Sequence, residues 1–205
     1  MSATKKVQPV LGFATAADWE AWLAENHADP TGVWLKLKKK GGAEPLVTYL
    51  EALEVALCWG WIDGQAGTGD EHHYRQRFTP RRKASPWSKI NRDRVEALTA
   101  AGRMRPPGQA EVDRAKEDGR WERAYDGART ATVPDDLTAA LAASPKAKAL
   151  FDALDGANRF AILYRVQTAK TETSRAAQIA KLVAMLAEGK TIHPRAEKKA
   201  AVKKK

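Results

Sequence analysis

Cationic and aromatic side chains alternate in the segment RFTPRRKASPWSKIN, which spans residues 77–91. Guanidinium groups bind phosphates and carboxylates through paired hydrogen bonds, and aromatic rings stack on flat ligands. A serine before a helix caps its N-terminus, where backbone amides attract anions. The segment therefore predicts an anion-binding site, unless its cations are merely a solvated face. The candidate residues are Arg77, Arg81, Arg82, Lys83, Trp87, Ser88 and Lys89.

A second group of candidates lies in WGWIDGQ, residues 59–65. Trp59 and Trp61 flank a glycine, which would let a ligand or another backbone approach closely. Asp63 and Gln65 bring polar groups to what we expect to be the end of a helix. Two interpretations remain open: a ligand pocket rimmed by tryptophan, or aromatic side chains that simply pack in the core.

Few residues suggest catalysis or metal binding. Asp63 is the one weak catalytic candidate, and an enzyme would use it with Arg77 or Arg82 as substrate anchors. Cys58 lies in an apolar segment, where a thiol is usually inert. The sequence contains none of the common nucleotide-binding, zinc-protease or hydrolase motifs. We therefore expect no metal and no cofactor, and we lean away from an enzyme.

The positive charge of the chain is concentrated in two stretches. Residues 75–105 contain ten basic and two acidic side chains, and residues 190–205 contain seven and one. The net charge of the 205-residue chain is +10. A localised positive field attracts anionic partners, such as a nucleotide, a nucleic acid or an acidic protein surface. No segment is apolar enough to span a membrane or serve as a signal peptide, and the single cysteine suits a reducing compartment, so we expect a cytoplasmic protein.

Hydrophobic periodicity predicts the elements that would position these residues. Apolar and polar residues alternate over 33–40 and over 73–79, which is typical of half-buried strands. Helical spacing favours helices over 49–62, where Thr48 and Glu51 form a capping-box pattern, and over 89–101. We expect an α+β fold with a small antiparallel sheet packed on helices, followed by a helical C-terminal module.

Composition shifts predict the domain organisation. Residues 1–10 are expected to be a disordered lead, 11–125 an α+β domain and 126–134 a linker rich in turn formers. Residues 135–189 are alanine-rich and predict four helices, at 135–143, 145–154, 156–169 and 173–188. The lysine-rich stretch 190–205 is expected to be a disordered tail.

Three blocks of sequence resemble a known family. ALCWGWIDGQ, then YRQRFTPRRKASPWSKINRDRVEALTAAGRM, and finally FAILYRVQTAKTETSRAAQIAKLVAMLAEGK are similar to the YdeI/OmpD-associated family, also called bacteriocin-protection proteins. The resemblance covers about residues 10–190. It implies a cytosolic bacterial protein linked to stress or antimicrobial-peptide tolerance, and it implies no catalytic mechanism.

Three functions are compatible with these observations. The first is a non-enzymatic binding protein whose anionic ligand lies in a groove between residues 59–63 and residues 81–89. The second is a small-molecule enzyme that uses Asp63. The third is a scaffold in which the same residues are only core and rim.

Overall fold

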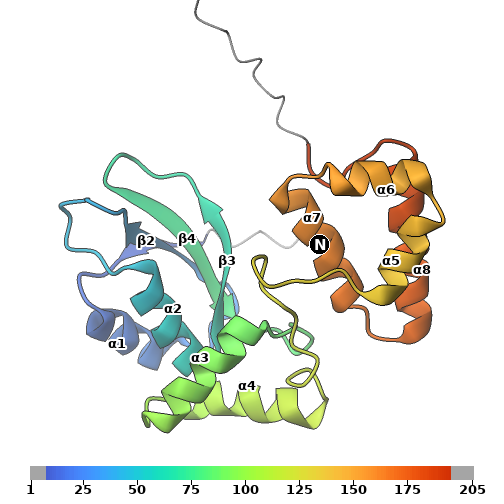
Figure 1. Ribbon diagram of the computed structural model, residues 1–205. Coiled ribbons are helices and arrows are strands. Elements are labelled where there is room, and N and C mark those ends of the chain that lie inside the picture. Colours follow the sequence, from blue (N-terminus) through green and yellow to red (C-terminus); the bar gives the residue numbers. More distant parts are fainter. Residues whose placement is uncertain (1–7, 195–205) are drawn as a thin grey trace, which may run out of the picture. The chain divides into compact units, whose positions relative to one another are not determined.

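The computed structural model describes residues 8–194, which divide into two compact units between Ala124 and Tyr125 (Figure 1). The first unit combines a sheet with helices, and the second is entirely helical among the residues described. The α+β class and the helical C-terminal module are therefore confirmed. The ends of the predicted lead and tail, residues 1–7 and 195–205, lie outside the described residues.

The sheet of the N-terminal unit has four strands in the order β1-β2-β4-β3. They are β1 (Val10–Gly12), β2 (Val33–Lys38), β3 (Trp61–Gly67) and β4 (His73–Pro80). The two predicted strands, β2 and β4, pair antiparallel along their length, with Val33 opposite Phe78 and Lys38 opposite His73. The sheet is nevertheless mixed, because β1 pairs parallel to β2.

Alternation along the strands gives the sheet two different faces. Val33, Leu35 and Leu37 of β2 and Phe78 of β4 are buried. The helices pack on this inner face, where the ring of Trp19 from the first helix lies 6.0 Å from that of Phe78. The side chains between them point to the opposite face, which we call the outer face of the sheet.

The helices of this unit are α1 (Ala16–Asn26), α2 (Tyr49–Cys58), α3 (Lys89–Ala100) and α4 (Pro106–Glu117). Thr48 and Glu51 form the predicted capping box at the start of α2. Trp19, Trp61 and Trp87 are fully buried in a core that also includes most of α2. Packing of these large rings against α2 fixes the helical layer on the sheet.

Two strands were not predicted, and one helix is shorter than predicted. The helix expected over 49–62 ends at Cys58, because Gly60 adopts a positive φ of 75° and redirects the chain. Trp61 then begins β3, where the end of the helix was expected. β1 begins at Val10, inside the segment predicted to be a disordered lead.

The C-terminal unit contains α5 (Asp135–Ala142), α6 (Pro145–Asp152), α7 (Gly156–Gln167) and α8 (Glu172–Ala187), close to the four predicted helices. Its core is made mainly of aliphatic side chains from all four helices, together with Phe151. Asn158 is buried and exchanges hydrogen bonds with the backbone of His193, which attaches the segment after α8 to α7. No helix within residues 8–194 is long and apolar enough to cross a membrane.

Candidate functional site

Trp59 follows the end of α2, and the ring of Trp61, the first residue of β3, packs against the helical layer. Trp61 is buried, and its indole Nε1 donates to the carbonyl of His27 at 2.8 Å. Trp59 is half-buried beside the imidazole of His27, at a ring distance of 5.2 Å. A Cβ on Gly60 would lie 2.9 Å from the carbonyl oxygen of Pro107. The first turn of α4 therefore fills the space beside this glycine, which favours the packing interpretation for it.

Arg81 and Trp87 are also buried, and they contact each other. The guanidinium carbon of Arg81 lies 3.6 Å from the centre of the Trp87 ring, which packs edge-on against Trp121. A cation over an indole face is stabilising inside a protein. These two residues thus contribute to the fold of the 81–88 turn and do not form an open anion site.

The remaining residues of the predicted groove differ in exposure. Arg82, Lys83 and Lys89 are exposed, while Ser88 is buried and caps α3 by accepting a hydrogen bond from the amide of Asn91. Gln65 is exposed at an irregularity in β3. The groove between residues 59–63 and 81–89 stays a prediction.

Asp63 lies on the inner side of β3, opposite Phe78. Its carboxylate accepts a hydrogen bond of 2.9 Å from the hydroxyl of Tyr49. Arg77 precedes Phe78 and so points to the outer face. The enzyme hypothesis paired Asp63 with Arg77 or Arg82. The sheet places Asp63 and Arg77 on opposite faces, and the pairing with Arg82 stays a prediction.

The Tyr49–Asp63 pair gives a pH-dependent prediction. Burial and the Asp63 carboxylate both raise the pKa of Tyr49 far above its ordinary value. Because folding favours the protonated phenol, its stabilising contribution is complete below pH about 10 and is lost as pH rises through the folded-state pKa. Absorbance titration near 295 nm should show this tyrosine ionising last, and Asp63→Asn should bring its transition to lower pH. Unchanged titration in Asp63→Asn would contradict the assignment, and Tyr49→Phe identifies the transition.

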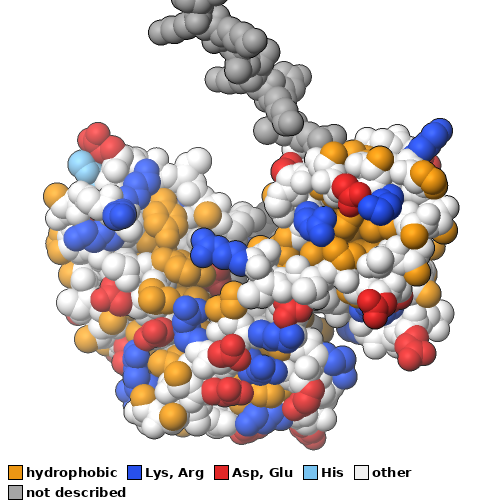
Figure 2. Space-filling model, in the orientation of Figure 1, with side chains coloured by type: hydrophobic (Ala, Val, Ile, Leu, Met, Phe, Trp, Pro, Cys, Tyr) orange, Lys and Arg blue, Asp and Glu red, His pale blue; other side chains and the backbone are white. Residues whose placement is uncertain are grey.

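The outer face of the sheet carries several cationic side chains and a tryptophan. Trp34 and Lys36 of β2 lie opposite Arg77 and Arg75 of β4, in adjacent pairs of the antiparallel register. Each of these side chains is partly exposed. In the space-filling view, blue Lys and Arg side chains lie beside orange hydrophobic ones over the sheet of this unit (Figure 2).

Gly67 of β3 makes room for Trp34 on the outer face, and Gly64 lies beside Arg77. A Cβ on Gly67 would lie 2.8 Å from the six-membered ring of Trp34, so the indole extends from β2 across β4 to β3. A Cβ on Gly64 would lie 3.6 Å from Cβ of Arg77. Gly67 pairs with Arg75, so the indole crosses β4 in the region of Arg75 and Arg77. The flat ring of Trp34 is thus supported by the backbone of β3 at Gly67. Arg75 and Arg77 of β4 lie beside it.

The cations of the outer face differ from those elsewhere in the same basic stretch. Arg103 and Arg105 are held by Glu54 and Glu20, at 2.8 and 2.6 Å. Arg75 donates to the carbonyl of Thr68 at 2.8 Å, a contact that leaves its charge uncompensated. Within residues 8–194, no ion pair is formed by Lys36, Arg75 or Arg77. The outer face is therefore positively charged.

Sequence reasoning identified Arg77 but missed Trp34, Lys36 and Arg75 as a set. The signal was present in the alternation of the two strands, which already indicated a basic outer side for residues 33–40. What was missing was the register, which puts Trp34 opposite Arg77. Without it, residues 77–91 were grouped by their proximity in sequence.

The structure thus defines a two-part protein: a mixed sheet with helices on one face, followed by a module of four helices. Residues 130–189 match the family model described as "Bacteriocin-protection, YdeI or OmpD-Associated". Residues 11–111 match a model described as a domain of unknown function, DUF8412. Residues 130–189 are therefore a YdeI/OmpD-associated domain, and the two N-terminal blocks quoted above fall within the DUF8412 model. Comparisons with curated proteins and with solved structures gave no match.

Proposed function

We propose that the protein binds single-stranded nucleic acid on the outer face of its N-terminal sheet, without catalysing a reaction. The observation that carries the proposal is the indole of Trp34 lying over Gly67 among Lys36, Arg75 and Arg77. Each part of this arrangement has a counterpart in a polynucleotide: the ring can stack on a base, and the cations can neutralise phosphates.

Single-stranded nucleic acid suits this face better than the other anionic partners expected from the sequence. An acidic protein surface would use the cations but not the flat ring. A duplex keeps its bases stacked inside, so it too would leave Trp34 unused. An unpaired strand offers base faces and phosphates together. The proposal retains the cytosol as the compartment, because a chain with a single cysteine suits a reducing environment.

Salt dependence separates the stacking contribution from the ionic one. The test measures binding of a fluorescent single-stranded oligothymidylate to the full chain across a range of salt concentrations. Trp34→Ala should weaken binding roughly 5- to 100-fold, the expected loss for one stacked base, with the slope of log K against log salt unchanged. Arg75→Ala with Arg77→Ala should make that slope shallower by about 1.4, because two phosphate contacts are lost.

The matched control removes the same charge from a different place. Arg82→Ala with Lys83→Ala deletes two exposed cations of the 81–88 turn and leaves the sheet intact. We expect it to reduce affinity less than the Arg75 and Arg77 variant does. Equal or greater loss in this control, with Trp34→Ala binding normally, would assign the site to the turn and refute the sheet-face proposal.

A further inference from the structure

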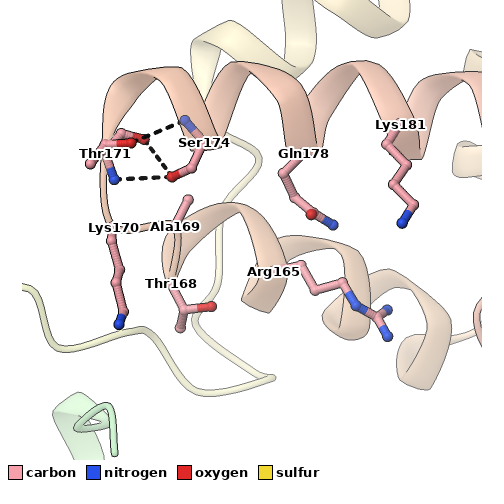
Figure 3. Close-up of a pocket in the computed structure, with 8 residues that line it drawn as sticks. All are labelled: Arg165, Thr168, Ala169, Lys170, Thr171, Ser174, Gln178 and Lys181. Atoms are coloured by element: carbon pink, nitrogen blue, oxygen red, sulfur yellow. Dashed lines mark hydrogen bonds between the residues drawn. The ribbon is translucent and has the colours of Figure 1, made fainter. Parts of the chain in front are cut away.

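The C-terminal unit contains a cavity of about 570 Å³ between the end of α7 and the first half of α8. Figure 3 shows Gln178 and Lys181 projecting from α8 on the side where Arg165 extends from α7. Lys170, in the turn between the two helices, also lines the cavity. This cavity is separate from the sheet, and the function proposed above does not use it.

The lining of the cavity carries positive charge only. It contains three cations, Arg165, Lys170 and Lys181, and no carboxylate. Among the residues described, none of the three forms an ion pair. Arg175, on the same helix α8, provides the contrast, because Asp136 holds its guanidinium through two hydrogen bonds of 2.6 and 2.9 Å.

The hydroxyls at the start of α8 are already committed to the fold. Thr171 and Ser174 form a reciprocal capping box, in which each side chain accepts a hydrogen bond from the other residue's amide. A ligand would therefore be bound by the three cations and by the side-chain carboxamide of Gln178. The spacing of Gln178 and Lys181 puts them on one side of α8, so both can reach the same group.

We infer that this cavity binds a small molecule through a chain of phosphate groups. Its volume falls in the range of sites for small ligands. Multiple cations without carboxylates favour a ligand with several negative charges close together. No aromatic side chain lines the cavity, so it offers no ring to stack on a base. Recognition should therefore depend on the phosphates and be nearly independent of any attached nucleoside.

The test compares inorganic tripolyphosphate with ATP by isothermal titration calorimetry on the full chain, at low salt and without magnesium. Both ligands should bind, with affinities within about threefold of each other. Arg165→Ala and Lys181→Ala should each weaken tripolyphosphate binding by roughly tenfold or more, the expected loss of one charge-assisted hydrogen bond. Both side chains are exposed, so these variants should fold, which circular dichroism checks.

Two controls locate the binding. Lys148→Ala removes an exposed cation of α6 whose partner is Asp152, and it should leave tripolyphosphate affinity unchanged. Trp34→Ala with Arg75→Ala and Arg77→Ala disables the outer face of the sheet and should also leave it unchanged. The inference is overturned if tripolyphosphate does not bind, if the Lys148 variant loses as much as the Lys181 variant, or if only the sheet variant loses affinity. ATP binding without tripolyphosphate binding would also overturn it.

Discussion

Replacing Trp61 with alanine should lower the free energy of unfolding of the N-terminal unit by about 3–5 kcal/mol, the usual cost of removing a buried aromatic side chain. The Trp61 ring packs edge-on against Trp19 and Trp22, at 6.1 and 5.9 Å. Its Nε1 is also the hydrogen-bond donor to His27 after the end of α1. The substitution removes both the ring contacts and that bond, and it leaves a cavity between β3 and α1.

Urea denaturation followed by tryptophan fluorescence can measure this loss in the N-terminal unit alone. All seven tryptophans lie between residues 19 and 121, so their emission reports the N-terminal unit only. Trp61→Phe keeps an aromatic ring and loses the hydrogen bond, and it should cost about 1–3 kcal/mol. A loss below about 1 kcal/mol in Trp61→Ala would mean that Trp61 is not a core residue. Trp61 and the partly exposed Trp59 would then remain candidates for the rim of a ligand pocket.

Gly108→Ala is expected to have the second largest effect. Gly108 is buried in α4, and a Cβ there would lie 2.1 Å from the carbonyl oxygen and 2.6 Å from the carbonyl carbon of Cys58. Both atoms are backbone at the end of α2, so no side-chain rotation relieves the overlap. The two helices must separate, and we expect a loss of about 1–3 kcal/mol or more.

The control for this substitution is Gly64→Ala in the same unit. Its Cβ would meet the side chain of Arg77 at 3.6 Å, an ordinary contact distance. It should change the free energy of unfolding by less than about 1 kcal/mol in the same fluorescence assay. Similar stability for Gly108→Ala and the wild type would show that α4 does not approach α2 as closely as described.

The position of Gly108 also explains how the first turn of α4 comes to fill the space beside Gly60. The amide of Arg105 donates to the Cys58 carbonyl at 3.1 Å, and the missing side chain at Gly108 lets the first turn of α4 lie against the end of α2. A Cβ at this position would keep the two helix ends apart, so their close approach here depends on glycine. The sequence did not predict this contact, because Gly108 lies in a polar helix and its partner, Cys58, is distant in sequence.

Local sequence patterns by themselves determined much of this protein. The alternation of residues 33–40 and 73–79 identified β2 and β4 because a strand with one buried face requires a period of two. Thr48 with Glu51 fixed the start of α2, since this pair satisfies free amides at a helix N-terminus. The four C-terminal helices followed from helical spacing and from the turns between them. The family resemblance followed, for residues 130–189, from the last of the quoted blocks.

Tertiary structure decided which residues could act together. Arg77 and Arg81 are close in sequence, yet Arg77 lies on the outer face of the sheet and Arg81 lies in the core against Trp87. Trp34 and Gly67 are far apart in sequence, yet one covers the other. Strand register and helix packing depend on contacts between segments that are distant in sequence. These contacts determine which side chains are buried and to which face each side chain points. Spacing along the chain constrains only neighbours within a few residues, so the cations were predictable as a group, but the surface that they share was not.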